Sequence, residues 1–439
     1  MRITRLPLVL LLLSARPAHS DLALAVAKEG GVPPHVRATH VVLVRDGTHQ
    51  VLTLRQDVAG GARDYALVIP VPGAIEPAQV RLTDGGAIDR LEAWTAIHAQ
   101  ESWDAAACPV TGLQNTMQAD GVTIQAITNS REWSERLGDT VSMPVAVTLT
   151  ALTAEQSSAA AAWLRVHGYT VPLDASAVLE NHQRRGMNFV IAEVTRSPGG
   201  PPQVQQLPAV QIAYETQSNQ LLLGCAARMD EGGCEVTVHV LSARGRVDAA
   251  GPHAERLPSG SELPEYVRED VAGYARSLVE HTLAKAGEDS WLLEFSDISS
   301  AAHGGRTTAM SDGDLRALGF IASERIVLGD QPPNAWITRL YHNRGPWRSV
   351  GDLGLLETGD RAEFAPTFHI RHEWRGNTQC EDAAAYLASL PARRQKQAEE
   401  LAALTGWPIE SIRAQMAVRE DYHRSDEPAA PWWASALSH

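Results

Sequence analysis

The densest group of titratable side chains lies in residues 368–373, whose sequence is FHIRHE. A zinc-binding helix would place two histidines four residues apart, with a glutamate between them. Here His369 and His372 are three residues apart, and Glu373 lies outside the pair. The surrounding composition favours a strand, on which His369 and His372 point to opposite faces. Both are catalytic candidates, with ordinary strand histidines as the simpler interpretation.

Motifs of several enzyme classes are absent from the sequence. It contains no GxSxG elbow, no Walker A loop and no GxGxxG turn between a strand and a helix. His239 is a further catalytic candidate, because the members of a catalytic triad can be scattered along a chain. Residues 312–314, DGD, resemble part of a calcium loop but lack its other carboxylates, so a helix cap explains them. We expect neither a metal nor a cofactor.

The four cysteines include no CxxC pair. Cys225 and Cys234 flank a turn-rich segment, a spacing that suits two strands of a hairpin, so we expect a Cys225–Cys234 disulfide. Cys108 and Cys380 would then pair by elimination. That bond would tie a C-terminal segment to the N-terminal half of the chain. Four reduced, buried thiols are the alternative.

The chain contains 11 Trp, more than its 8 Tyr or 5 Phe. Most of the indoles are expected to anchor the core. Trp432 and Trp433 differ, because they lie in a C-terminal segment where no core is predicted. We expect this pair to contact a partner or to dock onto the body of the same molecule.

The first twenty residues have the pattern of a secretory signal peptide. Arg2 and Arg5 precede the apolar run 8–13, and residues 18–20, AHS, match a small-x-small cleavage site. The apolar run is far shorter than the roughly 20 residues of a membrane span. We therefore expect an extracytoplasmic protein, periplasmic or secreted, that is soluble after cleavage near Ser20. A buried N-terminal helix or strand is the alternative.

The chain is acidic, with 38 Lys and Arg against 52 Asp and Glu, and its formal net charge is −14. Cleavage would remove three arginines and no acidic residue, which leaves a charge of −17. So negative a chain has no general basis for binding a phosphate backbone, and we expect no nucleic-acid partner. No later apolar run reaches spanning length, so we expect no transmembrane segment after cleavage.

The candidate residues must be positioned by a β-rich fold. Asp46-Gly47 between the runs 40–44 and 50–54 predicts a hairpin. The apolar run Tyr65–Val71 predicts a central strand that is buried on both faces. Further strands are expected at 145–152, 189–194, 210–214, 221–226, 235–241, 291–295, 335–341 and 364–373. Helices are expected at 88–98, 154–166, 177–185, 265–286, 312–318, 383–390, 392–404 and 410–419.

These elements predict an α+β fold, with a β-rich body of mostly antiparallel sheets, flanking helices and a helical C-terminal extension. The expected divisions are a signal peptide at 1–20, a body at 21–374, the helical extension at 375–424 and a flexible tail at 425–439. A division of the body into two lobes, 21–142 and 143–374, is the alternative.

Several short motifs follow one another in a fixed order along residues 36–375. They are DYALVIPVP at 64–72, DRL at 89–91, CP at 108–109, WL at 163–164, GY at 168–169, GMNFV at 186–190, VHVL at 238–241, DLRALG at 314–319 and WITRL at 336–340. In order and spacing they resemble a family of exported bacterial proteins, domain of unknown function 2330. The resemblance implies export and a single folded body, and it implies no catalytic residues.

The leading functional interpretation is an exported, non-catalytic protein that binds an unidentified protein or an envelope component. The alternative is an extracytoplasmic hydrolase with a dispersed site around His239, or around His369 and His372. A pocket that joins a histidine, a carboxylate and a hydroxyl would favour the hydrolase. A surface with exposed tryptophans would favour the binding protein.

Overall fold

The computed structural model describes residues 24–83, 85–108, 123–126, 145–197, 204–221, 234–250, 254–287, 290–301, 309–320, 334–344, 353–376 and 380–425. Within these residues the chain forms four sheets, mostly antiparallel, together with helices that include a C-terminal pair. This confirms the α+β fold class expected from the sequence.

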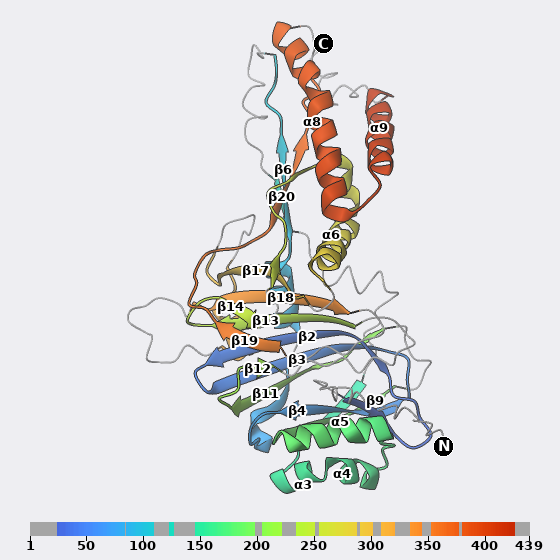
Figure 1. Cartoon of the computed structure of the whole chain (residues 1–439), viewed down its shortest axis with the longest axis vertical. Helices are drawn as coiled ribbons and strands as arrows, with labels where there is room; N and C mark the ends of the chain where they lie inside the picture. Colours follow the sequence, from blue (N-terminus) through green and yellow to red (C-terminus); the bar gives the residue numbers. More distant parts are fainter. Residues whose placement is uncertain are drawn as a thin grey trace, which may run out of the picture.

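The largest sheet has nine strands and forms the centre of the molecule (Figure 1). In order these are β15 (Glu255–Arg256), β17 (Leu292–Ile298), β18 (Trp336–Arg344), β13 (Cys234–Ser242), β2 (His35–Asp46), β3 (His49–Ala59), β11 (Ala209–Glu215) and β5 (Val80–Thr83), with β10 (Gln205–Gln206) beside β3. Neighbours are antiparallel except for the pairs β13–β2 and β15–β17. The predicted hairpin joins β2 to β3, and Gly47 adopts the positive φ of 64° that its tight turn requires.

A four-stranded antiparallel sheet packs on one face of the central sheet. Its strands, in order, are β1 (Leu24–Ala27), β4 (Asp64–Val71), β9 (Asn188–Arg196) and β8 (Val145–Ala151). The predicted strand β4 is therefore central and buried on both faces. Leu67 and Ile69 share a core with the central sheet, whereas Ala66 and Val68 face the helices on the other side. Those helices are α3 (Ala154–Ser158), α4 (Ala160–Val166) and α5 (Leu173–Arg184).

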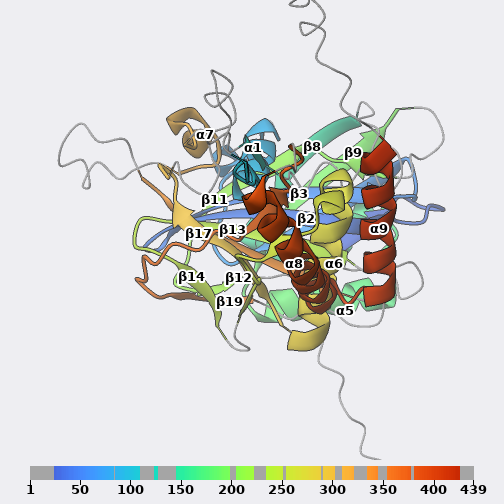
Figure 2. The same ribbon diagram turned by 90° about the horizontal axis from the view of Figure 1, so that it is seen from above.

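The opposite face of the central sheet is covered by α1 (Gly86–Thr95) and α7 (Asp312–Ala317), which lie next to each other (Figure 2). Arg90 of α1 donates to Asp314 of α7 at 2.7 Å. The Ser311 side chain caps the first turn of α7, as its capping-box sequence predicts. Four layers result, in the order helix, sheet, sheet, helix.

A second four-stranded sheet extends away from this body along the long axis, as Figure 1 shows for β6 and β20. Its order is β16 (Glu262–Leu263), β20 (Thr367–His372), β6 (His98–Trp103) and β7 (Thr123–Ala126). We call this sheet and the adjacent α8 (Glu381–Thr405) the arm. The apolar core of the arm also includes residues from η3 (Glu265–Asp270), α6 (Val271–Ala286) and α9 (Ile409–Ser425).

Helix α8 corrects the prediction of two separate helices at 383–390 and 392–404. It continues through Pro391, although proline removes a backbone donor and clashes with the preceding turn. Leu390 lies on one side of this proline, Ala398 and Leu401 lie on the other, and all three are buried. We infer that burial of these side chains outweighs the lost hydrogen bond.

The remaining elements are a three-stranded sheet, β12 (Gln220–Leu221), β19 (Leu353–Glu357) and β14 (Val247–Ala250), and the short helix η1 (Pro77–Gln79). Within the described part of the chain, none of the helices combines the length and the apolar character that a membrane crossing requires.

Candidate functional site

His239 lies in the middle of β13 and is completely buried. Its Cα partner on the neighbouring strand β18 is Arg339. The Nε2 atom of His239 lies 2.9 Å from the Thr95 hydroxyl at the end of α1. The Nδ1 atom lies 3.9 Å from the Glu92 carboxylate, one helical turn earlier. The structure thus brings a hydroxyl, an imidazole and a carboxylate together in that order.

Glu92 is the centre of a larger buried group of charges between α1 and the central sheet. Arg339 pairs with Glu92 at 3.3 Å and with Glu294 of β17 at 2.5 Å. His40 of β2 contacts Glu92 at 2.9 Å. We call these residues the His239 cluster: His40, Glu92, His239, Glu294 and Arg339. None of them is more than 8% exposed.

The His239 cluster holds its two histidines in opposite protonation states. Burial lowers the pKa of His239 to about 3, with Arg339 and His40 adding to the effect against Glu92, so its imidazole is neutral. Burial also disfavours the charge on His40, but Asp57 and Glu92 outweigh burial and raise its pKa to about 9. For Glu92, burial is opposed mainly by Arg339, and the net effect holds its pKa well below the usual range. Two buried cations, the His40 imidazolium and the Arg339 guanidinium, therefore face the carboxyl groups of Glu92 and Glu294.

In the Thr95–His239–Glu92 arrangement, the Thr95 hydroxyl makes two further hydrogen bonds within the protein. It donates to the Leu91 carbonyl oxygen at 2.8 Å and accepts from Arg339 at 3.2 Å. The 3.9 Å between His239 and Glu92 exceeds hydrogen-bonding distance. Thr95, His239 and Glu92 are all nearly inaccessible to solvent, so a substrate could not reach them in this conformation.

The raised pKa of His40 predicts a loss of stability at alkaline pH. The stabilisation from its charged form is complete below the unfolded pKa of 6.5 and is lost as pH rises through the folded pKa of about 9. We expect deprotonation of His40 to lower the free energy of unfolding by about 3 kcal/mol as the pH rises from 6.5 through about 9. Urea unfolding at a series of pH values measures the loss, and His40→Gln is expected to remove it.

The matched control for this titration is His49→Gln. His49 also contacts a glutamate, Glu215, at 2.9 Å, but both side chains are at least half exposed. Such a surface pair contributes little to stability, so this variant should keep the wild-type pH profile. A wild-type profile in His40→Gln would show that the buried pair contributes no pH dependence.

The other two candidate histidines lie in β20, which confirms the predicted strand. His369 is half-buried and lies on the opposite face from His372. His372 is buried and engages two carboxylates, with Nε2 2.9 Å from Glu101 and Nδ1 3.1 Å from Glu265. The structure therefore does not join His369 and His372 into one site.

Trp103 stands beside His372 on the neighbouring strand β6, where the two residues are Cα partners. Their rings stack with centroids 4.6 Å apart and planes inclined by 13°. Trp103 is 50% exposed, although it is a large aromatic residue. We call the following group the Trp103 cluster: Glu101, Trp103, Glu265, Arg268, His372 and Arg375. It presents an aromatic ring to solvent, with charged side chains around it.

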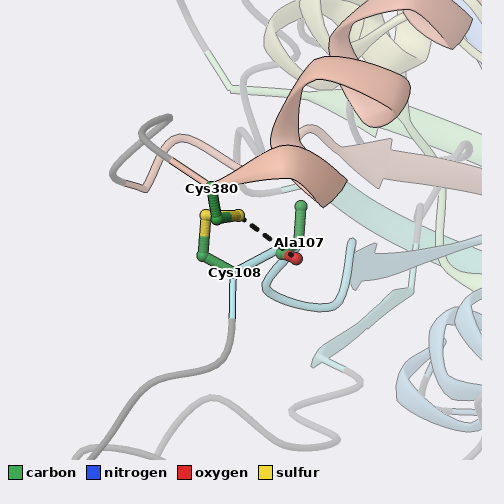
Figure 3. Close-up of a disulfide and its surroundings, with 3 residues drawn as sticks. All are labelled: Ala107, Cys108 and Cys380. Atoms are coloured by element: carbon green, nitrogen blue, oxygen red, sulfur yellow. Dashed lines mark hydrogen bonds between the residues drawn. A yellow bond between two sulfur atoms is a disulfide. The ribbon is translucent and has the colours of Figure 1, made fainter.

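The disulfide predicted by elimination, Cys108–Cys380, is present and joins the segment after β6 to the start of α8 (Figure 3). Its two cysteines are 272 residues apart in sequence. The Cys380 sulfur lies 3.8 Å from the Ala107 carbonyl oxygen. This contact is not a hydrogen bond, because a disulfide sulfur carries no proton.

Several predicted features lie outside the described residues. These are the signal peptide with its cleavage site near Ser20, the cysteine Cys225, the side chain of Cys234, and both Trp432 and Trp433. In the part of the chain that is described, His, Cys, Asp and Glu side chains form no group of three that could hold a metal ion.

A surface pocket of about 430 Å³ opens elsewhere in the body. It lies where β4, α5 and β11 end, and its lining includes Gly73, Arg185, Asn188 and Ser218. Its lining includes no residue of the His239 cluster or the Trp103 cluster, so it does not supply either with a substrate cavity.

Sequence reasoning found His239 and His372 but missed their partners. The available signal was a charged residue inside an apolar strand, as with Glu294 in WLLEF and Arg339 in WITRLY. Charges at such positions are rarely buried unless they are paired. The signal marks each residue as a member of a buried pair, but it does not say which partner it has.

Comparison with known proteins gives one family match. A family model described as uncharacterized protein conserved in bacteria (DUF2330) matches residues 25–344. No curated protein matches the chain. A crystal structure of baculovirus P35 aligns with 74% of this chain, and the alignment covers 98% of the P35 chain at 11% identity. Its TM-score of 0.26 is too low to indicate a shared fold. Strand β20, with His372, and Cys380 lie beyond the family match.

Proposed function

This chain belongs to the DUF2330 family of uncharacterized proteins conserved in bacteria, and from this premise we propose that it is an exported, non-catalytic binding protein. Its partner is a protein or envelope component that contacts the arm at the Trp103 cluster. Two observations support export, namely the signal-peptide pattern of residues 1–20 and the Cys108–Cys380 disulfide. Disulfides persist in oxidising compartments outside the cytoplasm.

The observation that carries the binding proposal is the half-exposed ring of Trp103. Its stacking on His372 covers one face of the indole, while half of the residue stays exposed to solvent. Tryptophan is among the residues that contribute most to binding energy at interfaces. The charged side chains around it, Arg268 and Arg375 among them, are suited to a polar rim.

Export and disulfide formation can be tested together by fractionating cells that produce the full chain. Under the proposal, the mature protein is recovered from an extracytoplasmic fraction and begins at Asp21. Its Cys108 and Cys380 resist alkylation until a reductant is added. A full-length protein that stays in the cytoplasm would contradict export.

We expect a photoreactive aromatic residue at position 103 to form a covalent adduct with one partner in intact cells. The matched control is position 356, because Leu356 of β19 is similarly exposed, at 55%, but lies on the body. Mass spectrometry identifies the adduct, which is then purified. Trp103→Ala should weaken binding of that purified component by roughly 30-fold, the effect of losing a dominant interface residue.

Two results would contradict the proposal. Equal adducts at positions 103 and 356, or none at 103, would remove the arm as the binding surface. Covalent labelling by a fluorophosphonate probe that is lost in Thr95→Val would instead favour the alternative, a hydrolase centred on Thr95, His239 and Glu92. That alternative is motivated by the 2.9 Å contact between Thr95 and His239.

A further inference from the structure

The two ring nitrogens of His372 each face a carboxylate. Glu101 lies 2.9 Å from Nε2 and Glu265 lies 3.1 Å from Nδ1. A carboxylate that is ionised only accepts hydrogen bonds, and a neutral imidazole carries only one N–H. Both contacts can be hydrogen bonds only when the ring is an imidazolium. The two contacts therefore require that His372 is protonated on both ring nitrogens.

His372 is the middle member of a chain of alternating charges within the Trp103 cluster. Arg268 contacts Glu101 at 3.3 Å on one side, and Arg375 contacts Glu265 at 2.8 Å on the other. On the opposite face of β20, Arg371 pairs with Asp104 at the end of β6. Loss of the proton from His372 would leave one of the two carboxylates facing a nitrogen lone pair.

Trp103 stacks on this same ring, so a charge on His372 lies against the face of the indole. A cation against the face of an indole is attracted by the ring electrons, and this attraction is lost in the neutral form. The neighbouring groups favour the cation. The contact with Glu265 raises the pKa of His372 most, burial opposes it, and Glu101 adds to the increase.

We propose that His372 is a pH-dependent switch that fixes Trp103 in its stacked position when protonated and releases it when deprotonated. The proposal rests on the binding function proposed for the Trp103 cluster, and it describes how that binding is regulated. The charge-assisted contacts are complete below the ordinary histidine pKa and are lost as pH rises through the raised pKa of His372. The arm therefore presents an ordered ring at acidic and neutral pH and a mobile one at alkaline pH.

Fluorine NMR of protein labelled with fluorotryptophan tests the switch without any partner. The chain has 11 Trp, so the resonance of Trp103 is assigned by its absence in Trp103→Phe. Between about pH 5 and about pH 9 this resonance should shift with a midpoint above the ordinary histidine value of about 6.5. His372→Gln should abolish the transition.

The matched control is His369→Gln, because His369 lies in the same strand on the opposite face and should leave the transition unchanged. Glu265→Gln keeps the histidine but removes one carboxylate, so it should lower the midpoint by about one pH unit. The other tryptophan resonances report whether each variant is folded. A Trp103 resonance that does not respond to pH, or a transition that survives in His372→Gln, would overturn the proposal.

The two proposals fail in distinguishable ways. If the Trp103 resonance does not respond to pH but position 103 still forms its adduct, the switch is wrong and the binding function stands. If the resonance titrates as expected but no adduct forms at any pH, the switch operates and the proposed function is wrong.

Discussion

Replacing Arg339 with methionine is expected to lower the free energy of unfolding by about 3–5 kcal/mol, the cost of removing one partner from a buried ion pair. Arg339 is the shared cation of two carboxylates, Glu92 and Glu294, and all three side chains are nearly inaccessible. The variant leaves both carboxyl groups in the interior, with the His40 imidazolium as the remaining cation beside Glu92. Methionine is chosen because it fills much of the same volume without charge.

Chemical unfolding monitored by circular dichroism measures the loss. The control is Arg413→Met, because Arg413 is exposed on α9 and donates to Gln395 on the surface. That change should stay within about 0.5 kcal/mol of wild type. Adding Glu294→Gln to the Arg339 variant removes one of the two buried carboxyl groups left without their cation and should restore part of the stability. Equal stability of the Arg339 and Arg413 variants would show that the His239 cluster does not stabilise the fold.

Loss of the Cys108–Cys380 disulfide is expected to lower the free energy of unfolding by about 2–4 kcal/mol. The bond closes a loop across 272 residues, so it strongly restricts the unfolded chain. Because the disulfide joins the end of β6 to the start of α8, its loss should also increase the mobility of the arm more than that of the rest of the molecule. The double variant Cys108→Ser/Cys380→Ser tests both effects.

Thermal unfolding gives the global change, and hydrogen exchange locates it. Exchange should increase in β6, β20 and α8, while α3, α4 and α5 at the other end of the molecule serve as the internal control (Figure 1). Either single substitution should reproduce the double variant, since each breaks the same bond. Unchanged exchange in the arm would mean that the disulfide does not hold α8 against the sheet.

The elements of the fold could be predicted to the extent that their signals are local. Asp46-Gly47 specifies a tight turn, Thr153 begins a capping box, Ser311 caps α7, and the apolar run of β4 indicates a strand buried on both faces. Pro391 gave a wrong helix boundary. Its local preference is overruled by burial of the side chains around it, and those contacts come from elsewhere in the chain.

The site was predictable only as isolated residues. His239 and His372 stand out because each is a polar residue among strand-forming ones. Thr95 lies 144 residues from His239, and Glu101 lies 271 residues from His372. Nothing in the segment around either histidine indicates these partners, since each is set by strand order and by the packing of α1 and η3.

By itself the sequence determined the strands of seven or more residues, the helix caps, the family and the cysteines available for pairing, because each depends on neighbouring residues or on composition. It did not determine β6, whose first residue, His98, it placed in a helix. The tertiary structure alone decided that His239 is neutral and closed off, that His372 lies between two carboxylates, and that Trp103 remains exposed beside it. The physical reason is that charge interactions depend on distance in space and on burial. Both quantities exist only once the sheets have packed.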